Sequence, residues 1–344
     1  MRVSEPLRTP VVLIVFNRPR VTRRNVAALR AARPEELFVI ADGPRANRPD
    51  DAALCDQVRA VVSDLDWPVR LHTRFAQRNL GLEANVELGM DWVFSQAQRA
   101  IVLEDDCIPD PTFFGYCEQL LDRYEAEPRV WLVSGDNHGV PGQLFAGASY
   151  AFSTWASVWG WATWADRWHR HRAEFPRDHA GAEDRYDRLP RTADAYRPAP
   201  AIPHGGALVT QAARRHFADV AANPDGDARG WDHHWWVSIM AAGGLSAVPA
   251  ANLVENDGFG DDATHTRAAK EPDPAVPMRF PMVHPPLALN ADVERELELI
   301  LLRTDGRLSR LARRVIRPLW LRSVVRRLIA FPPVWRAVRR LVGR

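Results

Sequence analysis

Three consecutive carboxylates stand where a predicted strand ends. Glu104, Asp105 and Asp106 directly follow the apolar, β-forming run Ala100–Leu103. Adjacent carboxylates at the end of a buried strand repel one another, but a divalent cation that joins them to a diphosphate would make the arrangement favourable. Mg²⁺ and Mn²⁺ prefer oxygen ligands and commonly bind through one or two carboxylates together with substrate phosphates. The other interpretation is a solvated acidic turn before the next helix, and the triplet alone leaves both open.

A fourth carboxylate, Asp232, follows Trp231 at the predicted start of a helix. A carboxylate in this position can deprotonate a hydroxyl group as that group attacks, and the indole of Trp231 can stack on a sugar. An aspartate that only caps its own helix is the alternative. The next residues, His233 and His234, are adjacent and diverge on a helix, whereas a paired-histidine metal site uses i, i+4 spacing. They therefore predict no such site.

Two further pairs of polar residues flank predicted elements. Asn17 and Arg18 follow the first strand, and a guanidinium at that place could pair with a diphosphate or stack on a base. Arg78 and Asn79 precede a helix whose N-terminus would favour an anion. A surface arginine at a helix start, or an ordinary loop and cap, is the alternative for these pairs.

The elements that must position these residues alternate along the first 135 residues. Apolar runs predict strands at 11–16, 37–41, 69–72, 100–103 and 130–134, with helical patterns between them. This alternation is typical of an α/β fold with a parallel sheet, whose ligands bind at the carboxyl ends of the strands. Asp42 and Asp136 follow two of these strands, so we expect them to converge with the acidic triplet. Asp136 could then bind sugar hydroxyls, whereas an Asx-type turn is the alternative for Asp42.

After residue 150 the pattern changes. Five tryptophans crowd residues 151–168, and most of them are expected to pack in a core. Residues 172–203 predict a loop-dominated insertion, and residues 256–270 suit a loop that closes over a ligand. The expected organisation is one α/β domain at 8–290, with a nucleotide-binding half at about 8–137 and an acceptor half at about 150–290, and a helical basic tail at 291–344.

The net charge of +2 conceals a strong asymmetry. Residues 303–344 hold 13 Arg and one acidic residue, whereas residues 1–302 carry 32 basic and 42 acidic side chains. In the tail, Arg alternates with apolar residues at helical spacing, which suits short amphipathic helices on an anionic membrane surface. Packing on the body's own acidic surface is the alternative. Nucleic-acid binding is disfavoured, since no nucleic-acid fold motif accompanies the charge.

The three cysteines, Cys55, Cys107 and Cys117, form no close-spaced pair and predict reduced thiols. The first apolar run, Val11–Phe16, is too short for a secretory signal. No run reaches the roughly 20 apolar residues that a membrane-spanning helix needs. We therefore expect a cytoplasmic protein that the tail holds at the inner face of the cytoplasmic membrane.

Motifs spaced over roughly residues 10–270 resemble bacterial family 2-like glycosyltransferases, including the hemolytic-protein-like group. They are also similar to the alpha-mannoside N-acetylglucosaminyltransferase family. The motifs are Phe16–Pro19, Ala41–Gly43, Arg78–Gly81, Ile101–Asp110 with Phe113 and Phe114, Val133–Gly135, Trp159–Trp161, Trp231–Asp232, Gly258–Gly260 and Ala263–Thr266.

The resemblance implies a GT-A fold, a mixed but mainly parallel sheet flanked by helices. It also implies that an inverting enzyme transfers a sugar from a UDP- or dTDP-sugar to a glycan or lipid-linked acceptor, with Mn²⁺ or Mg²⁺ as cofactor. The matching positions assign metal binding to Asp106 and His265, the acceptor base to Asp232, donor contacts to Asn17, Arg18, Asp42, Arg78, Asn79, Glu104 and Asp105, and acceptor contacts to Trp161 and Trp231.

Two alternatives to a glycosyltransferase remain open. A metal-dependent nucleotidyltransferase also uses carboxylates at strand ends, although the chain lacks an early glycine-rich phosphate loop with a basic residue. A peripheral membrane or carbohydrate-binding relative without catalytic activity is the other alternative, against which the intact triplet and Asp232 argue.

Overall fold

The alternating strands and helices predicted for the first 135 residues are present. A computed structural model of the protein describes residues 6–174, 231–258 and 273–301. The strands of this part are β1 (Val11–Val15), β2 (Glu36–Ala41), β3 (Arg70–Phe75), β4 (Arg99–Glu104) and β6 (Val130–Ser134). The helices between them are α1 (Pro19–Ala32), α2 (Asp51–Ser63), α3 (Leu82–Phe94) and α4 (Thr112–Tyr124).

The second half of the described chain completes the sheet. Its strands are β7 (Tyr150–Ser153), β8 (Trp161–Trp164) and β9 (Leu245–Pro249), and its helices are α5 (Ala165–Glu174), α7 (Trp231–Ala241) and α8 (Ala291–Leu301), with the short 3₁₀ turn Gly142–Phe145 before β7. The eight strands lie in the order β3-β2-β1-β4-β8-β6-β9-β7. Strands β8 and β7 run antiparallel to their neighbours, and the other six share one direction. The predicted fold class, a mixed but mainly parallel sheet with flanking helices, is confirmed.

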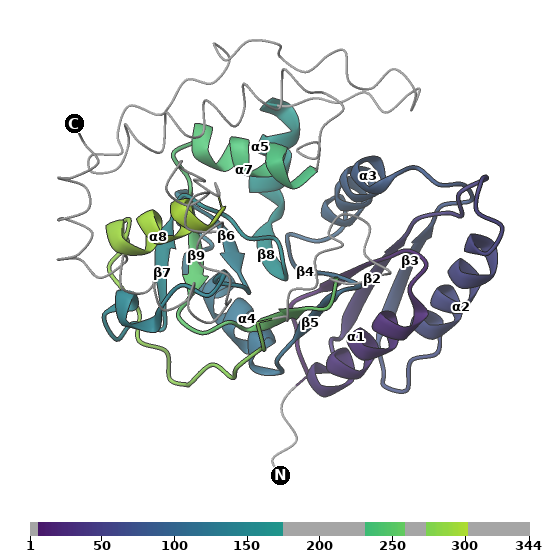
Figure 1. Ribbon diagram of the computed structural model, residues 1–344, viewed down its shortest axis with the longest axis horizontal. Coiled ribbons are helices and arrows are strands. Elements are labelled where there is room, and N and C mark those ends of the chain that lie inside the picture. Colours follow the sequence, from purple (N-terminus) through teal and green to yellow (C-terminus); the bar gives the residue numbers. More distant parts are fainter. Residues whose placement is uncertain (1–5, 175–230, 259–272, 302–344) are drawn as a thin grey trace, which may run out of the picture. The chain divides into compact units, whose positions relative to one another are not determined.

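Alternating side chains of the central strands build a core on each face of the sheet. Val11, Leu13 and Val15 pack with residues of α1, α2 and α4 on one face. Val12 and Ile14 pack with residues of α3, α5 and α7 on the other. Figure 1 shows these two groups of helices on opposite sides of the strands. A strand buried on both faces reads as a continuous apolar run, and this is why β1 is evident from sequence.

The tryptophan-rich segment supplies elements that the sequence pattern did not separate. Residues 151–168 include most of β7, all of β8 and the start of α5. Strand β8 has four residues and lies between β4 and β6, antiparallel to both. Four of the five tryptophans are buried, namely Trp155, Trp161, Trp164 and Trp168. The expectation that most of them pack in the core is confirmed.

Helix α8 packs on the main body through one buried carboxylate. Glu294 accepts hydrogen bonds from the Ser153 hydroxyl at 2.6 Å and from the Thr154 backbone N–H at 2.9 Å. These contacts attach the start of the region predicted as a tail to the end of β7. The basic segment 303–344, most of the 172–203 insertion and most of the 256–270 loop lie outside the described residues. No helix within the described ranges is long and apolar enough to cross a membrane.

Candidate active site

The predicted site residues gather at the carboxyl edge of the sheet because neighbouring parallel strands end in register. Ile14 of β1 pairs with Glu104 of β4, and Val15 pairs with Ala41 of β2. The residues that follow β1, β2 and β4 therefore leave the sheet at the same edge. Strand β8 starts there, where Trp161 is in register with residues near the ends of β4 and β6.

The acidic triplet divides between the two faces of the sheet. Side chains of a strand alternate between faces, and Glu104 lies on the side of α7, where Asp232 occupies the first turn. Burial raises the pKa of Glu104 well above its ordinary value, and the negative charges of Asp106, Asp232 and Asp105 raise it further. Glu104 and Asp232, far apart in the sequence, are therefore electrostatic neighbours. The Glu104 carboxyl group has no hydrogen-bond partner among the described residues, and Asp232 is partly exposed.

Asp105 lies on the opposite side, where Arg18 binds it with two nitrogens. Arg18 Nε donates to Asp105 Oδ2 at 3.1 Å, and Nη2 donates to Asp105 Oδ1 and, at 3.1 Å, to Asp106 Oδ2. Burial raises the pKa of Asp105 to about 6 even though the Arg18 charge lowers it. For Arg18, burial lowers the pKa, but Asp105 and Asp106 raise it by more. Asn25 donates to the backbone oxygens of Glu104 and Asp105 at 3.2 and 2.9 Å and holds the turn in place.

A short strand from late in the chain lies against Asp106. Strand β10 (Val254–Asn256) pairs antiparallel with β5 (Cys107–Pro109), and Asp257 N–H donates to the Asp106 carbonyl at 2.8 Å. Gly258 follows so closely that a Cβ there would overlap the Asp106 carboxylate. On α1, Arg24 binds Glu255 at 2.9 Å and also binds Asp257. These contacts, which the sequence did not indicate, hold Asp257 and Gly258 beside the triplet.

Asp42 is buried, and its carboxylate accepts four hydrogen bonds from groups of the chain itself. Its Oδ1 accepts from the backbone N–H groups of Gly43 and Leu80, both at 2.8 Å. Its Oδ2 accepts from Asn79 Nδ2 at 2.9 Å and from Gly81 N–H at 3.1 Å. Two carboxylate oxygens offer about four acceptor positions, so Asp42 is fully used in fastening the loop before α3. Burial raises the pKa of Asp42, although the hydrogen bonds from the three backbone N–H groups lower it.

Two other residues predicted to contact the donor, Asn17 and Arg78, lie in different surroundings. Asn17 donates to Asp51 at 2.8 Å, and Arg45 also binds Asp51, so Asn17 fixes the start of α2. Arg78 is exposed at the edge of the loop that Asp42 holds. Arg74, which sequence reasoning missed, is partly buried near Asp42, and its hydrogen bond to Asn85 is long, at 3.4 Å. An arginine in a mostly polar strand gave no distinct signal.

Asp136 holds a histidine that the sequence prediction also missed. Its Oδ1 accepts from the backbone N–H of His138 at 3.0 Å, and its Oδ2 lies 2.9 Å from His138 Nδ1. His138 adopts a left-handed conformation with φ of 53°, uncommon for a residue other than glycine. Its ring lies edge-on to Trp159, with centroids 5.1 Å apart. The Asp-x-His spacing was the available signal, and it is common in turns.

The two tryptophans predicted to contact an acceptor are buried. Trp161 and Trp231 are 0% and 2% exposed, and their rings stack on each other with centroids 5.6 Å apart. This arrangement gives both a packing role on the α7 side of the sheet. Trp159, next to Trp161, is the partly exposed tryptophan of this segment. The difference arises because Trp161 belongs to β8 and points into the core, whereas Trp159 precedes the strand.

The described carboxylates do not fit a divalent cation in their present arrangement. No three His, Cys, Asp or Glu side chains of the described ranges form a group that could hold a metal ion. Arg18 also occupies both oxygens of Asp105 and one oxygen of Asp106, which are the ligand atoms that a cation would need there. His265, the other predicted metal ligand, lies outside the described residues.

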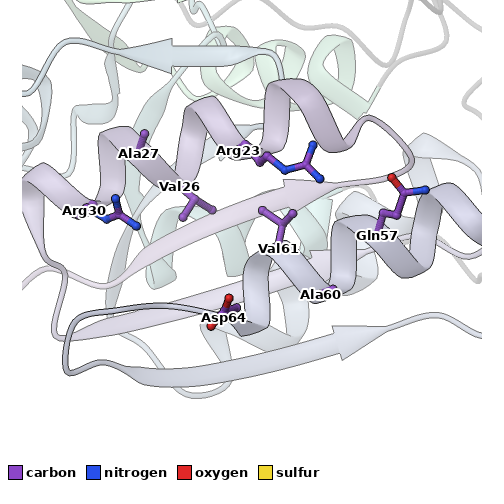
Figure 2. A pocket seen from close by; sticks show the side chains of 8 residues that line it. All are labelled: Arg23, Val26, Ala27, Arg30, Gln57, Ala60, Val61 and Asp64. Atoms are coloured by element: carbon purple, nitrogen blue, oxygen red, sulfur yellow. The ribbon is translucent and has the colours of Figure 1, made fainter.

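A separate surface groove of about 470 Å³ lies between α1 and α2. Figure 2 shows its lining, which comes from the facing sides of these two helices and from Asp64 just after α2: Arg23, Val26, Ala27, Arg30, Gln57, Ala60, Val61 and Asp64. None of the predicted site residues lines it. We therefore place the candidate site at the strand ends and not in this groove.

Comparisons with known proteins do not assign a family. No protein-family profile matches the chain, and no curated protein matches it in sequence. Among solved structures, the chain is similar to a cytidylyltransferase from Leptospira borgpetersenii serovar Hardjo-bovis (strain JB197). The two share 9% sequence identity and a TM-score of 0.33, over 59% of this chain and 71% of that chain. At this level the likeness carries no argument about activity, and the α/β fold class rests on the observed sheet.

Proposed function

We propose that this protein is a glycosyltransferase that moves a sugar from a nucleoside-diphosphate sugar to a hydroxyl group of a glycan or lipid-linked acceptor. The observation that carries the proposal is that Asp232, in the first turn of α7, lies on the same side of the sheet as Glu104 and contributes a charge that raises the Glu104 pKa, at the carboxyl edge of a mainly parallel sheet. Ligands of open α/β sheets bind at this edge. The order of motifs described above supports a sugar nucleotide as the ligand.

Asp232 is the proposed acceptor base. It is a partly exposed carboxylate in the first turn of α7. In an inverting transfer, the acceptor oxygen forms a bond to the anomeric carbon while the bond to the nucleoside diphosphate breaks, and the hydroxyl proton passes to the Asp232 carboxylate. The nucleoside diphosphate leaves with the electron pair of the broken bond.

Glu104 and Arg18 are the proposed donor contacts. The raised pKa of Glu104 favours its protonated form, which can donate a hydrogen bond to a donor hydroxyl. Arg18 is the cation of the described site that faces the acidic triplet, and a guanidinium can bind phosphate oxygens through paired N–H groups. The Mn²⁺ or Mg²⁺ expected from the resemblance enters no step of this mechanism, because Arg18 occupies the carboxylates that the ion would use.

The test combines nucleotide binding with turnover. A panel of UDP-, dTDP- and GDP-sugars is titrated by calorimetry. Turnover is followed as hydrolysis of the sugar nucleotide, which releases the nucleoside diphosphate, since water can replace an unidentified acceptor. Asp232→Asn is expected to keep the dissociation constant within about threefold and to lower turnover by about 10²–10⁴-fold, the usual contribution of a general base. Asp56→Asn, an exposed carboxylate of α2, is the matched control and should change neither.

Three results would contradict the proposal or part of it. If no sugar nucleotide binds, the chain is not this kind of transferase. If Asp232→Asn abolishes binding, Asp232 is a donor contact and not the base. If the chain instead consumes a nucleoside triphosphate and a sugar phosphate and releases pyrophosphate, it is a nucleotidyltransferase.

A further inference from the structure

The side chain of Arg18 reaches the acidic triplet from a rigid position. Arg18 directly precedes Pro19, the first residue of α1, and its carbonyl accepts from the Thr22 backbone N–H at 3.1 Å and from the Thr22 hydroxyl at 2.8 Å. The backbone of Arg18 is thereby fixed by the first turn of the helix. Its side chain is 23% exposed, so it is partly open to solvent while its Nε and Nη2 atoms meet the carboxylates.

The contacts of Arg18 are those that a bound cation would make. Both oxygens of Asp105 and one oxygen of Asp106 receive N–H groups from Nε and Nη2. Nη1 has no hydrogen-bond partner among the described residues, which leaves its two N–H groups available. A guanidinium carries five N–H donors in a fixed fork that matches carboxylate and phosphate oxygens. It can therefore join carboxylates on one side to a phosphate on the other.

We propose that the Arg18 guanidinium takes the charge-neutralising place of a divalent cation at the acidic triplet, so that this chain binds a nucleoside diphosphate without metal. The inference rests on the proposed function and names the group that meets the diphosphate of its donor.

The surroundings of Asp106 oppose the addition of a metal ion beside Arg18. One oxygen of Asp106 is hydrogen-bonded to Arg18, and the other lies 3.6 Å from the Cys107 sulfur. Gly258 approaches the same carboxylate closely enough to exclude even a methyl group at that position. A divalent ion on Asp106 would lie next to a positive guanidinium in a partly buried site, where repulsion between like charges is poorly screened. The ion and Arg18 therefore compete for one place.

The experiment measures UDP and dTDP binding by calorimetry in EDTA and in MnCl₂. The wild-type dissociation constants are expected to agree within about threefold between the two buffers. Arg18→Ala should weaken binding in EDTA at least tenfold, and Mn²⁺ should restore much of the loss because the carboxylates are then free to hold the ion. Arg18→Lys keeps the positive charge but lacks the paired N–H groups of a guanidinium, so its dissociation constant in EDTA should lie between those of the wild type and Arg18→Ala. Arg30→Ala is the matched control, since Arg30 lies on α1, the helix that Arg18 precedes, and forms an exposed ion pair with Asp66.

A second measurement uses Mn²⁺ alone and follows the free ion by electron paramagnetic resonance. Wild-type protein should bind no stoichiometric Mn²⁺, whereas Arg18→Ala should gain about one site. Thermal unfolding checks that the variants are folded. If Arg18→Ala is not folded, Arg18→Lys is compared with the wild type instead.

Two outcomes would overturn the inference while leaving the proposed function in place. One is nucleotide binding by the wild type only in Mn²⁺, and the other is Arg18→Ala binding in EDTA as tightly as the wild type. If neither nucleotide binds in either buffer and no sugar nucleotide of the full panel binds, the proposed function fails, and Mn²⁺ alone decides the inference. Stoichiometric Mn²⁺ binding by the wild type that Asp106→Asn removes would then refute it, and a site gained only in Arg18→Ala would support it.

Discussion

Replacing Asp42 with alanine is expected to destabilise the loop before α3 more than it changes any contact with a ligand. The carboxylate is 5% exposed and accepts four hydrogen bonds. Three come from the backbone N–H groups of Gly43, Leu80 and Gly81, and the fourth comes from Asn79. Alanine leaves all four donors without this acceptor, inside a loop so closely packed that a Cβ at position 43 would overlap the backbone of Arg78.

The magnitude follows from these contacts. A hydrogen bond to a charged group contributes about 1.5–3 kcal/mol, but water can reach part of the opened loop and satisfy some of the donors. Ionising Asp42 at this buried position is also unfavourable, since burial raises its pKa, and alanine removes that cost. We therefore expect a loss of about 3 kcal/mol in the free energy of unfolding, below the sum of the separate bonds. For a chain of 344 residues the midpoint of thermal unfolding should fall by roughly 4 °C, because the entropy of unfolding is about 2.1 cal/mol/K per residue.

The assay is urea denaturation together with hydrogen exchange of the Leu80 and Gly81 amides. Asp42→Asn should fall about midway, because its amide retains one oxygen acceptor and turns an N–H₂ group toward the remaining donors. Asp66→Ala, which removes an exposed ion pair with Arg30, should change stability by less than about 0.5 kcal/mol. If Asp42→Ala is as stable as Asp66→Ala, keeps its exchange protection and loses only nucleotide binding, the loop-anchor reasoning is refuted. Asp42 would then be the donor contact that the resemblance implies.

Other perturbations test further parts of the structure. Glu104→Gln should be more stable than the wild type above pH 4.5, by a margin that grows with pH. A carboxyl group whose pKa is raised in the folded state contributes stability below its ordinary pKa of 4.5 and loses that stability as the pH rises through the folded-state pKa. Equal urea midpoints of the two proteins at pH 8 would contradict this prediction. Trp161→Ala should cost about 3–5 kcal/mol, as expected for a large buried aromatic residue, and a loss below 1 kcal/mol by denaturation would show that it is not a core residue. Gly258→Val should displace the Asp106 carboxylate and weaken nucleotide binding with little effect on the midpoint of unfolding, whereas unchanged affinity would show that this close approach is irrelevant to the ligand. A chain that ends at residue 303 should lose flotation with liposomes of anionic lipid, and flotation equal to that of the full chain would exclude the basic segment as the anchor.

Much of the fold was evident from local sequence, for a physical reason. Strands β1, β2, β4 and β6 are covered on both faces, so each appears as a continuous apolar run. The antiparallel strand β8 was not evident, because Trp161–Trp164 is short and its place between β4 and β6 depends on pairing with residues far away in the chain. The tryptophan content indicated a core without indicating which strand it belonged to.

In the candidate site too, some features were evident from the sequence and others depend on the tertiary structure. By itself the sequence determined that Glu104–Asp106, Asp42 and Asp136 follow strands of an α/β sheet and so share one edge, because that follows from the alternation of strands and helices. Only the tertiary structure decided what each carboxylate meets there. Glu104 lies on the side of α7, where the charge of Asp232 acts on it, and Asp105 lies on the side of α1, where Arg18 binds it, because successive side chains leave the end of β4 toward opposite faces. Such pairings depend on how distant helices pack, and no local pattern of residue types encodes them.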